Sequence, residues 1–295
     1  MMLPVIRVKG NPASACEGAP HLDGFKLIWN GGMIATSFLA PIVWSWPAIL
    51  TFVVLTYLTM LLGHSIGMHR MMIHRTLRLP MLLARLLIYF GVLVGMGGPS
   101  RIIGVHDLRD WAQRLPDCHD FFSHRRGFWR DLSWQLFYRF EFRSRPEIII
   151  ESEIADDPFY RFLDRTWPLH ILSLAAVFYI IGGWPMVIWC VSLRCALSVV
   201  GHWTITYICH NPGPGRWRVE GAGVQASNLR FMAFLTHGEC WHNNHHAFPE
   251  SARIGLDPGQ WDPAWVVIRI LEQLGIAKDV KRPRSENQRD DLIEA

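Results

Sequence analysis

The stretch "GECWHNNHHAFPESARIGL", residues 238–256, places His242, His245 and His246 within five positions. On a helix, residues three and four apart lie on the same face, so these imidazoles would point toward one place. Imidazole is costly to bury and repels its neighbours once protonated, and a metal ion that takes the ring lone pairs removes both penalties. The spacing therefore indicates a metal site whose other ligands come from elsewhere in the chain.

Several more of the 14 histidines lie in short segments near the ends of apolar runs. They are His69, His74, His106, His119, His124, His202 and His210. His106 and Asp110, four residues apart, would share a helix face. His69 and His74, five apart, would lie roughly 140° apart on an ideal helix and converge only if the helix end unwinds or the site sits between helices. So many nitrogen and oxygen donors are too many for one ion, and they predict two.

The chain is unusually apolar for a domain of 295 residues, since 50% of its residues are hydrophobic. Four runs are long enough to cross a hydrocarbon core of about 30 Å. They lie at residues 28–45, 46–67, 166–183 and 184–208. The charge-free turns "WSWP" and "GGWP", with tryptophans suited to a membrane interface, would join them as two hairpins. A fifth run, 79–98, carries Arg85 and is expected to lie along the membrane face, the alternative being a true span.

Lys and Arg gather in the N-terminal segment, in 70–165 and after 210, and this distribution predicts the topology. By the positive-inside rule, these segments and both termini are cytoplasmic. The predicted fold is an all-α integral membrane protein with four transmembrane helices in two hairpins. A cytoplasmic helical cap, 68–165 and 209–282, would hold the metals, and 283–295 would be a flexible tail of the single domain 1–295.

Composition also limits the compartment and the partners. The six cysteines are scattered without a C-x-x-C pair, which fits a reducing compartment and argues against a disulfide framework or a cysteine-ligated cluster. The basic residues would face anionic headgroups or a substrate with phosphates. Membrane lipids are therefore expected partners, and nucleic acid is not.

The histidine motifs resemble those of the membrane-bound fatty acid desaturases of the stearoyl-CoA (acyl-CoA) type. That family has an H-x-x-x-x-H box, an H-x-x-H-H box, an N-S-x-x-H motif at the end of the last span and a second H-x-x-H-H box. "GMHRMMIHR", with His69 and His74, matches the first box, and "THGECWHNNHHAFPESARIGL" matches the last box well beyond its histidines. The resemblance covers about residues 30–282.

Two motifs depart from the family pattern. In "HDLRD", His106 matches, but Arg109 and Asp110 replace the paired histidines. In "TYICH", His210 matches, but Thr206 and Tyr207 stand where the family has asparagine and serine. We expect Asp110 to be an oxygen ligand, the alternative being a local cap or salt bridge. We expect His119, or else His124, to fill the remaining vacancy.

The resemblance implies two Fe²⁺ ions, O₂ as co-substrate and a cis double bond introduced into a fatty acyl chain, with acyl-CoA preferred to acyl-lipid. The implied metal ligands are His69, His74, His106, Asp110, His210, His242, His245 and His246. The implied electron donor is a ferredoxin or a small b-type cytochrome. The implied location is a multi-pass protein of the bacterial inner membrane with a cytoplasmic active site. The alternatives are a fatty acyl hydroxylase of the same superfamily and a non-catalytic metal-binding membrane protein.

We also predict roles for residues next to the expected ligands. Glu239 and Trp241 are candidates to support ligating histidines, because a carboxylate is the usual partner of a ligating His N–H. Asn243 and Asn244 would turn away and bind neighbouring loops. His64 and His202, deeper in their spans, would face each other rather than a metal.

Overall fold

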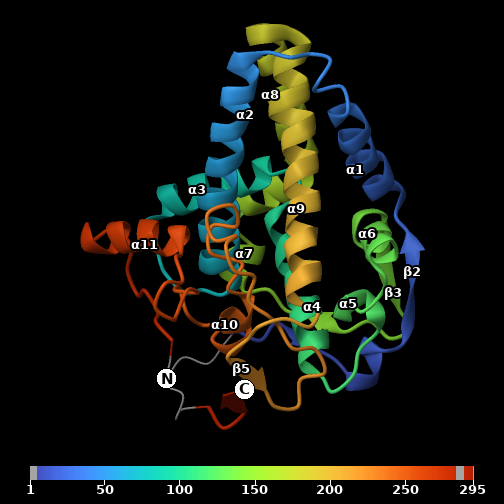
Figure 1. The fold of residues 1–295 in the computed structure, drawn as a ribbon, viewed down its shortest axis with the longest axis vertical. Coiled ribbons are helices and arrows are strands. Elements are labelled where there is room, and N and C mark those ends of the chain that lie inside the picture. Colours follow the sequence, from blue (N-terminus) through green and yellow to red (C-terminus); the bar gives the residue numbers. More distant parts are fainter. Residues whose placement is uncertain (1–4, 284–288, 295) are drawn as a thin grey trace.

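Long helices make up one end of the molecule, and short helices, strands and loops make up the other (Figure 1). The computed structural model describes residues 5–283 and 289–294. Its α-helices are α1 (Gly24–Ser37), α2 (Trp46–Leu58), α3 (Met81–Leu93), α4 (Pro99–Arg114), α5 (Asp120–Ser123), α6 (Phe128–Phe137), α7 (Ser152–Ala155), α8 (Pro158–Val187), α9 (Arg194–Cys209), α10 (His242–Ala247) and α11 (Pro263–Gln273). A short 3₁₀ helix, η1 (Pro12–Ala15), and two π-helical segments, η2 (Thr59–Ile73) and η3 (Ile188–Leu193), complete the helical elements described. The described strands are β1 (Val8–Lys9), β2 (Gly18–Leu22), β3 (Tyr138–Phe142), β4 (Glu147–Ile148), β5 (Trp217–Val219) and β6 (Leu292–Glu294).

The predicted span at 46–67 is part of a longer helical stretch, α2 followed directly by η2. Pro47 lies in its first turn, where a missing backbone N–H costs nothing. The stretch runs from Trp46 to Ile73 and is long and apolar enough to cross a membrane. The predicted span 28–45 is helical only as far as Ser37, the last residue of α1.

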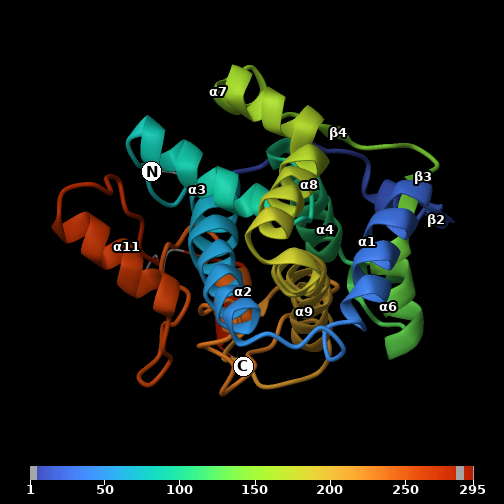
Figure 2. The ribbon, with the colours of Figure 1, turned by 90° about the horizontal axis from the view of Figure 1, so that it is seen from above.

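The predicted spans 166–183 and 184–208 correspond to α8, η3 and α9. Pro158–Cys209 is the second stretch long and apolar enough to cross a membrane, but it is not one straight helix. Gly182 and Gly183 leave the helical conformation, and Gly183 has φ +66°, which glycine adopts without a steric penalty. The chain therefore turns where "GGWP" predicts. Viewed from above, α2, α8 and α9 lie close together, with α1 beside α6 (Figure 2).

The long helices present apolar side chains to their surroundings. In the most apolar windows of the two long stretches, only 28% and 22% of residues are buried. Ile180, for example, is 83% exposed. Apolar surface of this extent is typical of contact with lipid, so the helices associate with a membrane. The crossing of four helices in two hairpins remains a prediction.

The crossing of η2 and α3 brings two backbones into direct contact. A Cβ atom on Gly63 would lie 2.2 Å from the backbone N of Gly91. Only glycine permits this approach, and it fixes where η2, which carries His64 and His69 and is followed directly by His74, lies against α3. Helix α3 runs across the long axis of α2 (Figure 1), the orientation predicted for the run 79–98.

Short strands add a β component that the all-α prediction lacks. The strands pair antiparallel as β1–β4, β2–β3 and β5–β6, each a sheet of two strands. Leu292 pairs with Val219 and Glu294 with Trp217, so these residues are ordered against β5, unlike the flexible tail predicted there. Residues 284–288 and 295 of that predicted tail lie outside the described residues.

Candidate metal centre

The π-helical segment η2 places His69 and His74 together. In a π-helix the backbone N–H bonds to the carbonyl five residues earlier, so residues five apart lie one turn apart. The N–H of His74 donates to the carbonyl of His69 at 3.0 Å. The Nε2 atoms of the two rings are 3.2 Å apart. The 140° separation expected of an ideal α-helix is thus removed by a change in helix type.

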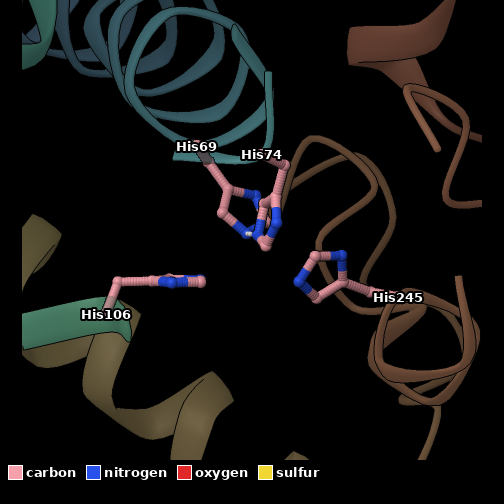
Figure 3. Close-up of side chains that lie close together, drawn as sticks. All are labelled: His69, His74, His106 and His245. Atoms are coloured by element: carbon pink, nitrogen blue, oxygen red, sulfur yellow. Dashed lines mark hydrogen bonds between the residues drawn. The ribbon is translucent and has the colours of Figure 1, made fainter. Parts of the chain in front are cut away.

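Helices α4 and α10 complete a group of four imidazoles. His106 comes from α4 and His245 from α10, and their rings converge with those of His69 and His74 (Figure 3). One ligand atom from each of the four lies within 4.8 Å of every other. Three segments far apart in the sequence therefore form a four-histidine group.

A second group joins the end of α9 to α10. His210, His242 and His246 have ligand atoms that also lie within 4.8 Å of one another. The Nε2 atoms of His210 and His246 are 3.3 Å apart. His242 and His246, the first and last histidines of the last box, belong to this group, while His245 belongs to the other. The single helix α10 therefore supplies histidines to both groups.

Hydrogen bonds to the ring nitrogens that point away from the group orient the histidine rings. Glu239 Oε2 lies 2.8 Å from His69 Nδ1 and Glu239 Oε1 accepts from Ser65 at 2.5 Å. Arg70 contacts Glu239 and is itself held by Asp262 at 2.9 Å. Glu239 thus contacts the candidate ligand His69 as predicted, whereas the Trp241 indole donates to the Trp261 carbonyl. Neither Ser65 nor Arg70 stands out in the sequence, because their roles depend on contacts about 170 residues away.

Two further histidines are oriented in the same manner. His210 Nδ1 lies 2.7 Å from the Thr206 carbonyl, so it donates there and leaves Nε2 for the group. His106 Nδ1 lies 3.2 Å from Asp107 Oδ1. Asp107 is held in turn by Arg7 at 2.9 Å.

The electrostatic environment keeps five of the seven imidazoles in the two groups neutral. Burial is the main cause that holds the pKa values well below the usual 6.5, and neighbouring imidazoles add to it, at His74, His210, His242, His245 and His246. Burial alone would raise the pKa of Glu239, but His69 and Arg70 hold it well below its usual range. Metal binding requires neutral imidazoles, because the ion takes the ring lone pair.

Unsatisfied ring nitrogens show that the residues fit a metal. His242 Nε2 and His245 Nδ1 are buried and have no hydrogen-bond partner among the described residues. An orphaned buried polar atom costs about 1–3 kcal/mol, a penalty that coordination removes. Nitrogen donors without cysteine, in two adjacent groups, suit ions such as iron, zinc, copper or nickel.

Asp110 lies in neither histidine group. Its Oδ2 is 3.8 Å from His106 Nδ1, and its Oδ1 is 4.0 Å from Arg109 Nε. Burial would raise the pKa of Asp110, but His106, Arg109 and Arg114 together hold it well below its usual range. Asp110 is therefore an ionised carboxylate beside the four-histidine group, and its ligation of a metal remains a prediction.

The histidine expected first to fill the vacancy, His119, lies elsewhere. Its Nδ1 accepts from the Phe121 N–H at 3.1 Å and caps the short helix α5. His124 instead stacks on His210, with ring centroids 5.4 Å apart. The preference for His119 is thus wrong, because the ring serves as a helix cap.

The remaining predictions near the site are confirmed. His64 and His202 face each other with ring centroids 4.8 Å apart. Asn243 Oδ1 accepts from the N–H groups of Arg216 and Trp217 at 2.9 Å each. Asn244 donates to the Ile254 carbonyl at 3.0 Å.

A cavity of about 200 Å³ reaches the histidines from the side of the long helices. Ile102, Val105 and Leu136 line its apolar part, together with His69, His106 and His242. Lys26 and Arg101 also line it, and burial lowers the pKa of Lys26 to about 8, with Arg101 contributing. The cavity thus joins apolar walls to the histidine nitrogens, and Lys26, Arg101 and Arg109 make it cationic.

Known proteins are similar in sequence to most of this chain. A family model described as fatty acid desaturase matches residues 44–256. An acyl-CoA 5-desaturase of Anemone leveillei is 34% identical over 272 residues, which cover 90% of this chain and 82% of that protein. An sn-1 stearoyl-lipid 9-desaturase of Anabaena variabilis is 32% identical over 270 residues, which cover 90% of this chain and 97% of that protein.

Proposed function

The chain belongs to the fatty acid desaturase family, and from this membership we propose that it is an O₂-dependent di-iron desaturase that introduces a cis double bond into a fatty acyl chain. The reaction removes one hydrogen from each of two neighbouring methylene carbons. One O₂, two electrons and two protons are consumed, and two water molecules are formed. Its electrons come from an external donor, for which we propose a ferredoxin or a small b-type cytochrome.

The observation that carries this proposal is the pair of histidine groups at the end of an apolar cavity. We assign His69, His74, His106 and His245 to one iron and His210, His242 and His246 to the other, with Asp110 as an oxygen donor beside the first. Two iron ions held by nitrogen with open positions would supply the strong oxidant that an unactivated C–H bond needs.

The side chains of this protein have three tasks in the reaction. Glu239 accepts the N–H of His69, which fixes the tautomer and directs Nε2 toward the other rings. Arg70, held by Asp262, fixes Glu239 in turn. Ile102, Val105 and Leu136 hold the acyl chain and exclude water from the reacting carbon.

For the carrier of the acyl chain we propose coenzyme A. An anionic group near the cavity would be favoured by the ammonium of Lys26 and the guanidinium of Arg101. Phosphates of coenzyme A and of a lipid headgroup share this chemistry, and the two relatives described above act on acyl-CoA and on stearoyl-lipid by name. Purified protein supplied with a reductase and donor, and either acyl-CoA or acyl-lipid vesicles, distinguishes the two carriers.

The proposed arrangement in the membrane has four spans, with the histidine end and both termini in the cytoplasm. This orientation places the metals where a soluble electron donor reaches them. Cysteines introduced singly at exposed positions, one in the Gly182–Gly183 turn and one in β5, test it by labelling with an impermeant reagent. Labelling of the β5 cysteine in intact cells would contradict the proposed orientation.

The function is tested by expression in a host that lacks its own desaturase, followed by chromatography of the fatty acids. We expect a new monounsaturated acid that disappears in a variant carrying His242→Ala and His245→Ala together. A hydroxylated acid in its place would identify a hydroxylase, and an unchanged profile from iron-loaded protein with a working donor would contradict the proposal.

A further inference from the structure

His124 lies beside the three-histidine group and belongs to none of the histidine boxes. Its ring stacks on that of His210, with the planes 26° apart and the centroids 5.4 Å apart. It lines the same cavity as His242. The residue is 1% exposed, so its ring meets protein and not solvent. An imidazole from the segment before α6 therefore faces the second group.

A buried carboxylate forms a hydrogen bond with Nδ1 of His124. Asp131, which is 0% exposed, lies with Oδ1 3.0 Å from His124 Nδ1. The same Oδ1 accepts from the Trp203 indole N–H at 2.6 Å. A carboxylate fixed in this way favours the tautomer with hydrogen on Nδ1 and a lone pair on Nε2. This is the usual support behind a histidine that ligates a metal.

The other ring nitrogen of His124, Nε2, is buried. It has no hydrogen-bond partner within the part of the chain that the structure describes. The backbone is unusual too, because His124 adopts φ +56° in the left-handed region. The orphaned nitrogen costs about 1–3 kcal/mol and the backbone conformation costs a similar amount. Both penalties are offset if Nε2 binds a ligand.

The second group is also the one that is short of a ligand. It has three histidines, whereas the first has four. Arg109, which stands where the family has a histidine, remains protonated and has no lone pair to give. Burial lowers its pKa without removing its charge. Its guanidinium acts on His210 and His242 and opposes a cation there, so a further donor would strengthen the binding of the ion.

We propose that His124 Nε2 is a ligand of the metal ion bound by His210, His242 and His246, in place of a histidine that the second box of this chain lacks. The assignment rests on the metal centre of the proposed function. His124 is not among the residues whose ligand atoms lie within 4.8 Å of one another, so its ring moves toward the ion as the ion binds. His119 does not compete for this role, because it caps α5.

The test is a titration of metal-free, full-length protein with Co²⁺, followed by visible absorption, together with the iron content of protein loaded with Fe²⁺. Wild type should hold two ions per chain. In His124→Ala, the second ion should be lost or bound more than about 100-fold more weakly, with the first ion unchanged. Asp131→Asn keeps the ring and removes its orienting carboxylate, and should weaken the second ion by about 10–100-fold.

His119→Ala is the matched control, since it removes a nearby imidazole that lies outside the proposed site. It should keep two ions with unchanged affinity. Two ions of wild-type affinity in both His124→Ala and Asp131→Asn would overturn the proposal. If His124→Ala does not fold, the Asp131→Asn titration decides alone. Wild-type protein that binds two ions and forms no unsaturated product would contradict the proposed function and leave the His124 assignment standing.

Discussion

His69 and His74 face each other across one π-helical turn, with their Nε2 atoms 3.2 Å apart and the N–H of His74 bonded to the carbonyl of His69 at 3.0 Å. Only in this helix type does a hydrogen bond join residues five apart across one turn. A regular α-helix would direct the two rings to different neighbours. The π-helical segment is therefore the structural condition for a four-histidine group that takes two ligands from one helix.

Replacing His74 by Ala should remove the ion of the four-histidine group. Its ring contacts those of His69, His106 and His245. We expect iron to fall from two ions to one per chain and turnover to fall by more than about 100-fold. Iron content is measured on the purified protein and turnover as unsaturated product. His21→Ala is the control, since His21 is an exposed residue of β2, and it should change neither quantity. Two ions retained in His74→Ala would remove His74 from the ligand set.

Replacing Glu239 by Gln tests the support behind His69. Gln keeps the size but presents a weaker, neutral acceptor to His69 Nδ1 and to Arg70. Removing such a partner typically costs about 10–100-fold in metal affinity. We expect the affinity for the first ion to fall by this factor while the second ion is retained. A Glu239→Gln protein with wild-type affinity for both ions would show that the carboxylate serves only to neutralise Arg70.

Replacing Asp110 by Asn tests the oxygen ligand proposed for the altered second box. Asn has no negative charge and is a poorer donor to iron. Since Asp110 lies beside His106, the first ion should be affected and the second retained. We expect iron content below two ions per chain and lower turnover. Asp117→Asn, shortly after the end of α4, is the control. Both irons and full turnover in Asp110→Asn would place this carboxylate outside the ligand set.

The buried imidazoles predict how the stability of the metal-free protein depends on pH. The folded-state pKa values of His74, His210, His242, His245 and His246 lie well below 6.5. Below about pH 6.5 the unfolded chain therefore binds protons that the folded chain does not, and the free energy of unfolding falls as the pH falls. Each such histidine contributes up to about 1.4 kcal/mol per pH unit.

Thermal melts of the metal-free protein between pH 7.5 and pH 5.5 measure this dependence. The melting temperature should fall steadily toward pH 5.5. Bound metal competes with protons for the same nitrogens, so iron-loaded protein should show its acid transition at lower pH. A melting temperature of the metal-free protein that does not change over this range would contradict neutral, buried imidazoles.

The candidate metal ligands that form a local sequence motif could be predicted from the sequence. His242, His245 and His246 follow helical spacing, and the first box is defined by its separation of five. The π-helical backbone, which brings together histidines five residues apart, has no comparable sequence motif, because it depends on how η2 packs against α3. The choice between His119 and His124 depends on Asp131, seven residues further on, and on Trp203 in α9. Such long-range partners become visible only in the fold.

The packing of η2 against α3 leads to the last prediction, Gly63→Ala. The added methyl group would lie 2.2 Å from the backbone N and 2.8 Å from the Cα of Gly91, and backbone atoms cannot move aside as a flexible side chain can. The helices must separate, at a cost of about 1–3 kcal/mol or more. Since η2 carries His69 and ends at His74, its C-cap, both the melting temperature and the iron content should fall. Gly32→Ala in α1 is the control, because no atom lies within 4 Å of the added carbon. A Gly63→Ala protein as stable and as iron-rich as Gly32→Ala would show that this crossing does not position the metal centre.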